Sequence, residues 1–284
     1  MTRHIVFHSD SDGMCSGAII YDWAQSQTKK ETILHPINYN DKFPLDQIGR
    51  VDEVYIVDFS IDTDVMDKLL EITPDVTWID HHKTAIAKYE GYQNMGLIKG
   101  IQSNEEAGCV LTWGHFYPNV VIPMAVLLIG DRDIWRYTYG DDTRHFNMGL
   151  LMHDINPIAP IWRQLFGDSG KSLTLDIQKD GRIAIKFRDA WAKVYTEAWG
   201  WEAEFEGIKC FVMNLGKCGS EYFGGKIKEY DICSAVAFNG VEWIVSLYSE
   251  KIDVSGLAVK HRGGGHKGAS GFQCKELPFR KISG

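Results

Sequence analysis

Three consecutive polar residues, Asp80, His81 and His82, follow an apolar and β-branched run over residues 75–79. A run of this kind, preceded by Pro74, predicts a buried parallel strand whose carboxyl end presents the three side chains. Open α/β sheets bind their ligands at that edge. One carboxylate and two imidazoles there can hold a divalent cation and leave one imidazole for a substrate. An ordinary strand end explains the tripeptide about equally well, so the other acidic segments decide between the two interpretations.

A polar loop near the amino terminus carries His8, Asp10 and Asp12 directly after a predicted strand over residues 4–7. Two carboxylates at this spacing repel each other unless a cation compensates their charge. In the alternative interpretation, Asp10 caps the next helix and Asp12 is a turn residue before Gly13. That alternative explains one aspartate but not both together with a histidine, so the pattern favours a metal site.

Two further acidic segments, with three aspartates between them, follow predicted elements. Asp58 ends a strand over residues 54–57, and Asp131 and Asp133 follow a predicted helix over residues 124–130. Each has an ordinary explanation, since Asp58 can cap a helix and the other two can form an ion pair or a solvated loop. Together, carboxylates with a minority of imidazoles and no thiolate favour Mn²⁺ or Mg²⁺. So many carboxylates suggest two ions that share one bridging ligand.

Alternating strands and helices must position these residues. The predicted strands cover residues 4–7, 32–39, 54–57 and 75–79, and the predicted helices cover residues 15–25, 64–71, 105–116 and 124–130. This alternation predicts a mostly parallel sheet with right-handed crossovers, which brings all the acidic segments to one edge. A helix over residues 182–199 is expected to lead out of this first domain, with Gly200 as its stop.

The pattern then changes to short strands, over residues 208–215, 231–238 and 241–248. Asn239-Gly240 between the last two is a hairpin signal. We therefore expect an α/β protein with a parallel-sheet domain (1–181), a helical linker (182–202) and a smaller α/β domain with a mixed sheet (203–284). The second domain ends in a glycine-rich segment, residues 262–271, which is expected to form a loop.

The composition is that of a globular protein with proper cores, because 44% of the 284 residues are hydrophobic. The formal net charge is −8, with 38 acidic against 30 basic residues. Such a charge repels a long polyanion unless metals or a local basic patch reverse it, so short phosphorylated substrates are expected. Six cysteines without a Cys-x-x-Cys pair argue against a structural zinc site and against a disulfide framework.

The amino terminus runs directly into the first predicted strand and leaves no room for a signal peptide. The longest apolar stretch, residues 120–129, is interrupted by Pro123 and is too short to span a bilayer. We therefore expect a cytoplasmic protein with no membrane contact.

Five segments in this order resemble the motifs of the DHH phosphoesterase superfamily and its glycine-rich carboxyl-terminal domain: His8-x-Asp10-x-Asp12-Gly13, Val57-Asp58, Asp80-His81-His82, Gly130-Asp131-Arg132-Asp133 and residues 263–271. The first motif is similar to that of the RecJ-type and short-oligonucleotide branch. It lacks the His-x-Asn-Pro-Asp-x-Asp form of other branches, because Met14 stands where those have a second aspartate.

The resemblance implies a ligand set for two Mn²⁺ ions, with Mg²⁺ as the alternative: His8, Asp10, Asp12, Asp58, His81 and Asp131. Asp58 would bridge the ions and His82 would contact the scissile phosphate. In the fourth motif the Asp-Arg-Asp-x-Trp form admits two registers, so either Asp131 or Asp133 can be the ligand. Two ions about 3.5–4 Å apart would activate a water for in-line attack and stabilise charge on the phosphoryl oxygens.

The glycine-rich segment has its own physical interpretation. Successive glycines, among them Gly264 and Gly265, let backbone N–H groups surround a phosphate or terminal nucleotide, while Arg262, His266 and Lys267 add positive charge. The alternative is a mobile surface loop. The domain is expected to grip the rest of the nucleotide across a cleft. Nine tryptophans could stack nucleobases, but most are expected in the cores.

The expected activity is that of a Mn²⁺-dependent phosphodiesterase or exonuclease on short single-stranded oligonucleotides, like an oligoribonuclease. The alternatives are a cyclic-dinucleotide phosphodiesterase, a nucleotide 3′-phosphatase and, in a different class, a nucleotide-binding regulator without catalysis. An inorganic pyrophosphatase is disfavoured by the spacing of the first motif. The sequence leaves open RNA or DNA preference, end polarity and the oligomeric state, including a homodimer.

Overall fold

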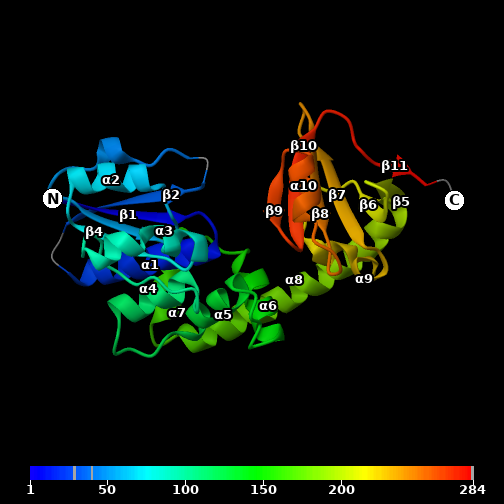
Figure 1. The fold of residues 1–284 in the computed structure, drawn as a ribbon. Coiled ribbons are helices and arrows are strands. Elements are labelled where there is room, and N and C mark those ends of the chain that lie inside the picture. Colours follow the sequence, from blue (N-terminus) through cyan, green and yellow to red (C-terminus); the bar gives the residue numbers. More distant parts are fainter. Residues whose placement is uncertain (28–29, 40, 283–284) are drawn as a thin grey trace. The chain divides into compact units, whose positions relative to one another are not determined.

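The computed structural model describes residues 1–27, 30–39 and 41–282. They form two compact units, Met1–Ala184 and Ile185–Gly284 (Figure 1). Both contain a sheet with helices packed on it, which confirms the predicted α/β class with a parallel first sheet and a mixed second one.

The first unit is built on four parallel strands: β1 (Thr2–His8), β2 (Glu31–Ile37), β3 (Glu53–Val57) and β4 (Val76–Ile79). Their order is β2-β1-β3-β4. The chain therefore places β2 on one side of β1 and then β3 on the other. Such a reversal is the switch point at which open α/β sheets bind ligands, here at the carboxyl ends of β1 and β3.

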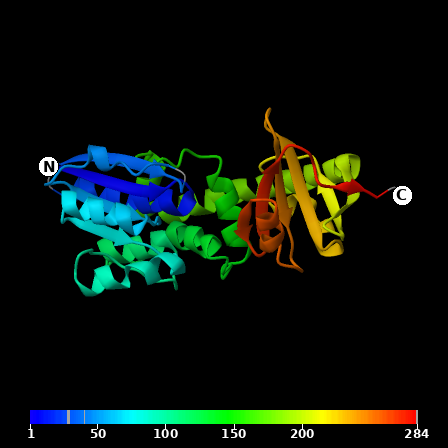
Figure 2. The same cartoon turned by 45° about the horizontal axis from the view of Figure 1, so that its top comes forward.

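Alternating side chains fill the two faces of this sheet. Val6, Ile56 and Trp78 pack with buried residues of α2 (Thr63–Ile72) and α3 (Lys83–Asn94), whereas Phe7, Val57 and Ile79 pack with α1 (Ser11–Ser26) and α4 (Gly108–Phe116). Figure 2 shows the helices on the sheet from a second direction. This two-residue period fixes which side chains emerge at the carboxyl edge.

A helical layer completes the first unit, with α5 (Met124–Asp133), α6 (Asp141–Leu150) and α7 (Pro160–Phe166) joining α1 and α4 around one core. Small residues of α1 allow close packing, since a Cβ at Gly17 would lie 3.1 Å from the Phe7 ring. The predicted end of α5 at Gly130 is wrong. The helix continues through Asp133, so both acidic residues of the fourth motif lie in its last turn.

The 30-residue helix α8 (Gly170–Trp199) runs from the first unit into the second and begins well before residue 182. The second sheet has the order β11-β5-β6-β7-β8-β10-β9, in which the pair β6–β7 is parallel and the others are antiparallel. Its strands are β5 (Gly200–Phe205), β6 (Ile208–Met213), β7 (Ile232–Phe238), β8 (Trp243–Tyr248), β9 (Gly264–His266), β10 (Ala269–Cys274) and β11 (Arg280–Lys281). The short elements are η1 (Leu45–Gln47), η2 (Ser220–Phe223), α9 (Lys226–Glu229) and α10 (Ser255–Lys260).

The Asn239-Gly240 hairpin is confirmed between β7 and β8. The Asn239 side-chain oxygen accepts the backbone N–H groups of Val241 and Glu242, and Gly240 has φ +97°. The glycine-rich segment, in contrast, is not a loop, because β9 and β10 pair as a hairpin with its turn at residues 267–268. Among the described residues, no helix is long and apolar enough to cross a membrane.

Candidate metal centre

The centre lies at the carboxyl edge of the first sheet, where Asp58 follows β3 and Asp80 follows β4. Asp58 has φ +50°, a conformation uncommon for residues other than glycine. Its backbone N–H donates to the carbonyl of Ile79, which holds the turn in place. A strained backbone of this kind is often found at functional sites, where it aims a side chain.

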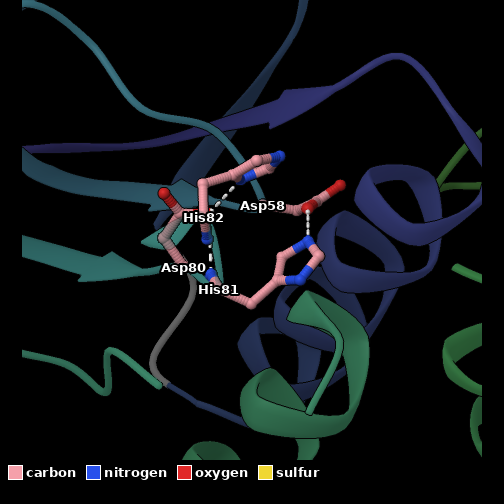
Figure 3. Close-up of side chains that lie close together, drawn as sticks. All are labelled: Asp58, Asp80, His81 and His82. Carbon is pink, nitrogen blue, oxygen red and sulfur yellow. Dashed lines mark hydrogen bonds and ion pairs between the residues drawn. The ribbon is translucent and has the colours of Figure 1, made fainter. Parts of the chain in front are cut away.

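The two oxygens of the Asp58 carboxylate face two different histidines. Oδ1 lies 3.0 Å from Nε2 of His81 (Figure 3), and Oδ2 lies 3.9 Å from Nδ1 of His8. Asp58 is 1% exposed, and its buried Oδ2 has no hydrogen-bond donor among the described residues. Burial raises the pKa of the Asp58 carboxyl well above its usual value, and four neighbouring aspartates raise it further. A buried carboxylate in such surroundings requires a proton or a cation.

A first group of possible ligands consists of His8, Asp10 and Asp58, whose ligand atoms lie within 4.8 Å of one another. Asp10 is the N-cap of α1, because its Oδ1 accepts the backbone N–H of Gly13 at 3.0 Å. Its Oδ2 lies 2.9 Å from Nδ1 of His8. Burial raises the pKa of Asp10, but hydrogen bonds from His8 and Gly13 outweigh it and lower the pKa to about 2. One oxygen of Asp10 therefore caps the helix, and the other is the possible metal ligand beside His8.

A second group consists of Asp12, His81 and Asp133, again with ligand atoms within 4.8 Å of one another. Nε2 of His81 lies 3.8 Å from Oδ2 of Asp12 and 3.4 Å from Oδ2 of Asp133. Burial, together with the charges of Asp12 and Asp10, raises the pKa of Asp133 to about 7. The second group therefore also gathers more negative charge than an apolar site tolerates without a cation.

Asp12 is not a turn residue, since it lies in the first turn of α1 and is 1% exposed. Its two oxygens accept the backbone N–H groups of Gly108 and Cys109, both at 2.7 Å, at the start of α4. A Cβ at Gly108 would lie 2.7 Å from the Asp58 Cβ, so only glycine lets α4 approach this closely.

Asp131 belongs to neither group. Its carboxylate accepts the backbone N–H groups of Thr138 at 2.8 Å and Tyr139 at 3.3 Å, and also the hydroxyl of Thr143. The fourth motif admits two registers. In the structure, Asp133 lies beside His81, whereas Asp131 is hydrogen-bonded within residues 138–143 and does not face the histidine.

Asp80 orients His82. Its Oδ1 lies 2.7 Å from Nδ1 of His82 and accepts the backbone N–H of His81 at 2.8 Å (Figure 3). The hydrogen bond to Asp80 raises the pKa of His82 above its usual value. The His82 side chain is 35% exposed, and Asp80 occupies Nδ1, so Nε2 is the ring nitrogen without a hydrogen bond to another described residue. Asp80 is fully buried, and within the part of the chain that the structure describes its Oδ2 has no hydrogen-bond donor.

A pocket of about 380 Å³ opens beside His82. Tyr39 and Phe59 form an aromatic wall with ring centroids 4.9 Å apart, and the Tyr39 ring lies 6.4 Å from the His82 ring. Asp41, Ser60, Asp62, Thr84 and Lys88 contribute the polar part of the lining. Sequence reasoning missed Tyr39, because an aromatic residue after a strand gives no signal of its place in the fold.

In the second unit, Arg262, Gly264, Gly265 and His266 are exposed on or beside the β9–β10 hairpin. Two glycines have reasons within the fold: Gly265 has φ +138°, and a Cβ at Gly263 would lie 2.0 Å from the carbonyl oxygen of Gly271. A Cβ at Gly264 would meet no atom within 4 Å. The glycine at position 264 is therefore not explained by packing within the hairpin.

Comparison with known proteins places this architecture. No protein-family model matches the chain. The chain is 29% identical to the uncharacterised protein R106 of Acanthamoeba polyphaga mimivirus over an alignment of 303 residues. This alignment covers 96% of the chain and 68% of the viral protein.

Solved structures show the same fold at low sequence identity. The DHH domain of a member of a ribosomal protein family aligns with a TM-score of 0.56 and 11% identity, over 99% of this chain and 83% of that one. A pGpG-specific phosphodiesterase, PggH from Vibrio cholerae, has a TM-score of 0.50 and 12% identity over 96% and 92% of the two chains. An exopolyphosphatase-related protein from Bacteroides fragilis has a TM-score of 0.50 and 15% identity over 97% and 87%. The chain thus has the two-domain fold of DHH proteins, as its motifs predict.

Proposed function

We propose that this protein is a divalent-metal-dependent phosphodiesterase that hydrolyses short single-stranded oligonucleotides. The observation that carries the proposal is the buried Asp58 carboxylate, whose two oxygens face His81 and His8 in two separate ligand groups. A carboxylate shared in this way suits a pair of ions and has no evident role in packing the sheet.

The side chains fit such a pair of ions. His8, Asp10 and Asp58 would hold one, and Asp12, His81 and Asp133 would hold the other. Asp58 would be shared, because its Oδ1 lies 3.0 Å from Nε2 of His81. Carboxylate and imidazole donors suit Mn²⁺ or Mg²⁺. The buried Oδ2 of Asp58, which has no hydrogen-bond partner among the residues described, would gain one. Bound there, two divalent ions would activate a water and neutralise charge on the phosphoryl oxygens.

The chain itself supplies the group that acts on the phosphate. His82, held at Nδ1 by Asp80, presents Nε2 for a hydrogen bond to a phosphoryl or leaving oxygen. Its raised pKa favours the protonated ring, which is the form that can donate from Nε2. His82 would thus be the catalytic side chain, and Asp80 would position it.

Two observations support a nucleotide substrate of small size. The pocket beside His82 has a volume of about 380 Å³ and an aromatic wall, so it accommodates one nucleoside rather than a duplex. The exposed Arg262 and His266 flank a glycine-lined backbone suited to a phosphate. Among the proteins of the same fold, PggH is described as a pGpG-specific phosphodiesterase, which acts on a dinucleotide.

A substrate panel tests the proposal. Di- to decanucleotides, cyclic dinucleotides and 3′-phosphorylated nucleotides are incubated with Mn²⁺ or with chelator, and the products are separated by chromatography. We expect metal-dependent cleavage of linear oligonucleotides by the wild type and none by Asp58→Asn. Full activity in chelator, or turnover by Asp58→Asn, would contradict the two-ion site. If only cyclic dinucleotides or only 3′-phosphorylated nucleotides are cleaved, the proposed substrate class of linear oligonucleotides is wrong.

A further inference from the structure

An exposed tryptophan lies close to the proposed metal ligands in the sequence. Trp135 follows Asp133 by two residues and is 75% exposed. An indole in water loses the burial that usually stabilises this side chain. Its backbone is also unusual, because Trp135 has φ +56° and Tyr137 has φ +51°, a region that bulky residues seldom adopt. The chain therefore carries both an exposed aromatic ring and local strain at this place.

Asp131 holds this strained turn together. Its backbone carbonyl accepts the N–H groups of Arg136 at 3.0 Å and Tyr137 at 3.3 Å. Its carboxylate accepts the N–H groups of Thr138 and Tyr139 and the Thr143 hydroxyl. Five donors thus converge on one buried residue. Such a dense set of bonds can offset the strain of two positive φ values, which is of the order of 1–3 kcal/mol each.

The ring of Trp135 has a fixed neighbour. The Tyr137 ring lies 6.1 Å from it in a T-shaped arrangement, and the Arg144 guanidinium lies 4.9 Å from the centre of the Tyr137 ring. Arg132, between the two aspartates, is exposed and forms no salt bridge among the described residues. We call Arg132, Trp135 and Tyr137 the Trp135 ledge.

We propose that the Trp135 ledge stacks a nucleobase of a single-stranded substrate whose phosphate lies at the metal centre. Stacking on an indole is worth about 1–3 kcal/mol per base and tolerates any base. A base inside a duplex has no free face, so the ledge selects single strands. Arg132 adds a positive charge for the adjoining phosphate. This inference rests on the proposed function and adds to it the residue that recognises single strands.

Fluorescence of a tetranucleotide carrying terminal 2-aminopurine tests the ledge, because stacking on an indole quenches this base. The oligonucleotide has phosphorothioate linkages to slow hydrolysis, and the titration is done with Mn²⁺. We expect quenching with the wild type, whereas Trp135→Phe, which keeps an aromatic ring but no indole, should retain most of the affinity with weaker quenching. Trp135→Ala should lose the quenching and weaken binding about tenfold or more. Trp199→Ala, which removes an indole that is 64% exposed in the second unit, should behave as the wild type.

Three outcomes would overturn the ledge. They are unchanged quenching and affinity in Trp135→Ala, equal affinity of the wild type for the duplex form, and a fall in molecular mass on Trp135→Ala, which would show that a second copy covers the indole. Circular dichroism and the melting temperature of both Trp135 variants verify that the protein has folded. Failure of the proposed function is distinct, since it appears as absent hydrolysis by the wild type in the substrate panel.

Discussion

Asp131 and Asp133 lie in the same helical turn but have different roles in the structure, and asparagine substitutions separate them. Asp133→Asn removes a charged oxygen that lies 3.4 Å from His81, so it should weaken Mn²⁺ binding at one of two sites by at least about 10–100-fold. The stability of Asp133→Asn without metal should stay equal or rise, because the burial and the neighbouring aspartate charges that raise the pKa of Asp133 to about 7 no longer act on a carboxylate. Calorimetric titration with Mn²⁺ measures the affinity.

Asp131→Asn should do the opposite. Oδ1 of Asp131 accepts from Thr138, and Oδ2 accepts from both Tyr139 and Thr143, so an amide with a single acceptor oxygen loses one or two of these three charge-assisted bonds. At about 1.5–3 kcal/mol per bond, the loss is about 1.5–6 kcal/mol. For a unit the size of the first one, Met1–Ala184, this loss should lower the melting temperature by roughly 10 °C. Two Mn²⁺ sites should remain. Loss of one site in Asp131→Asn, with both retained in Asp133→Asn, would refute the assignment of the two aspartates.

Three further predictions concern single side chains. His81→Ala should lose metal together with rate, whereas His82→Ala should keep metal and lose about 10²-fold or more in kcat; equal metal loss would reverse their roles. Gly264→Val meets open space and should fold normally, yet depress dinucleotide hydrolysis far more than that of a small aryl phosphodiester; an intact dinucleotide rate would exclude the hairpin from substrate binding. Burial and His4 lower the pKa of His35 to about 4. Because the histidine pKa in the unfolded chain is near 6.5, the unfolded state binds more protons between about pH 4 and 6.5 than the folded state does. The free energy of unfolding should therefore fall as the pH is lowered from about 6.5 to 4. His35→Gln should flatten that slope in urea titrations.

Much of the first domain is visible in the sequence, because its strands are buried on both faces and read as short apolar runs. The runs that end at Phe7, Val57 and Ile79 each lead into a polar segment, and parallel pairing brings those segments to one edge. Helix α3 was missed because its residues 83–94 carry a weakly amphipathic, polar-rich pattern. The β9–β10 hairpin was missed because glycines give no strand propensity.

The centre itself could be predicted as a set of residues but not as a geometry. Successive helical residues are turned by about 100°, so Asp131 and Asp133 point about 200° apart and only one can face His81. The sequence does not show where α5 ends. It therefore does not show which of the two aspartates faces His81. The ledge was equally hidden, since the positive φ values of Trp135 and Tyr137 come from the bonds to Asp131 and from no local sequence signal.

The central claim is that Asp58 lies between two divalent ions. Crystals grown with Mn²⁺ and measured at the manganese absorption edge test it most directly, with Asp58→Asn crystals as the control. We expect two anomalous peaks about 3.5–4 Å apart. Each should contact one oxygen of Asp58, the first beside His8 and Asp10 and the second beside His81 and Asp133. A single peak, or two peaks of which neither contacts Asp58, would contradict the proposed centre.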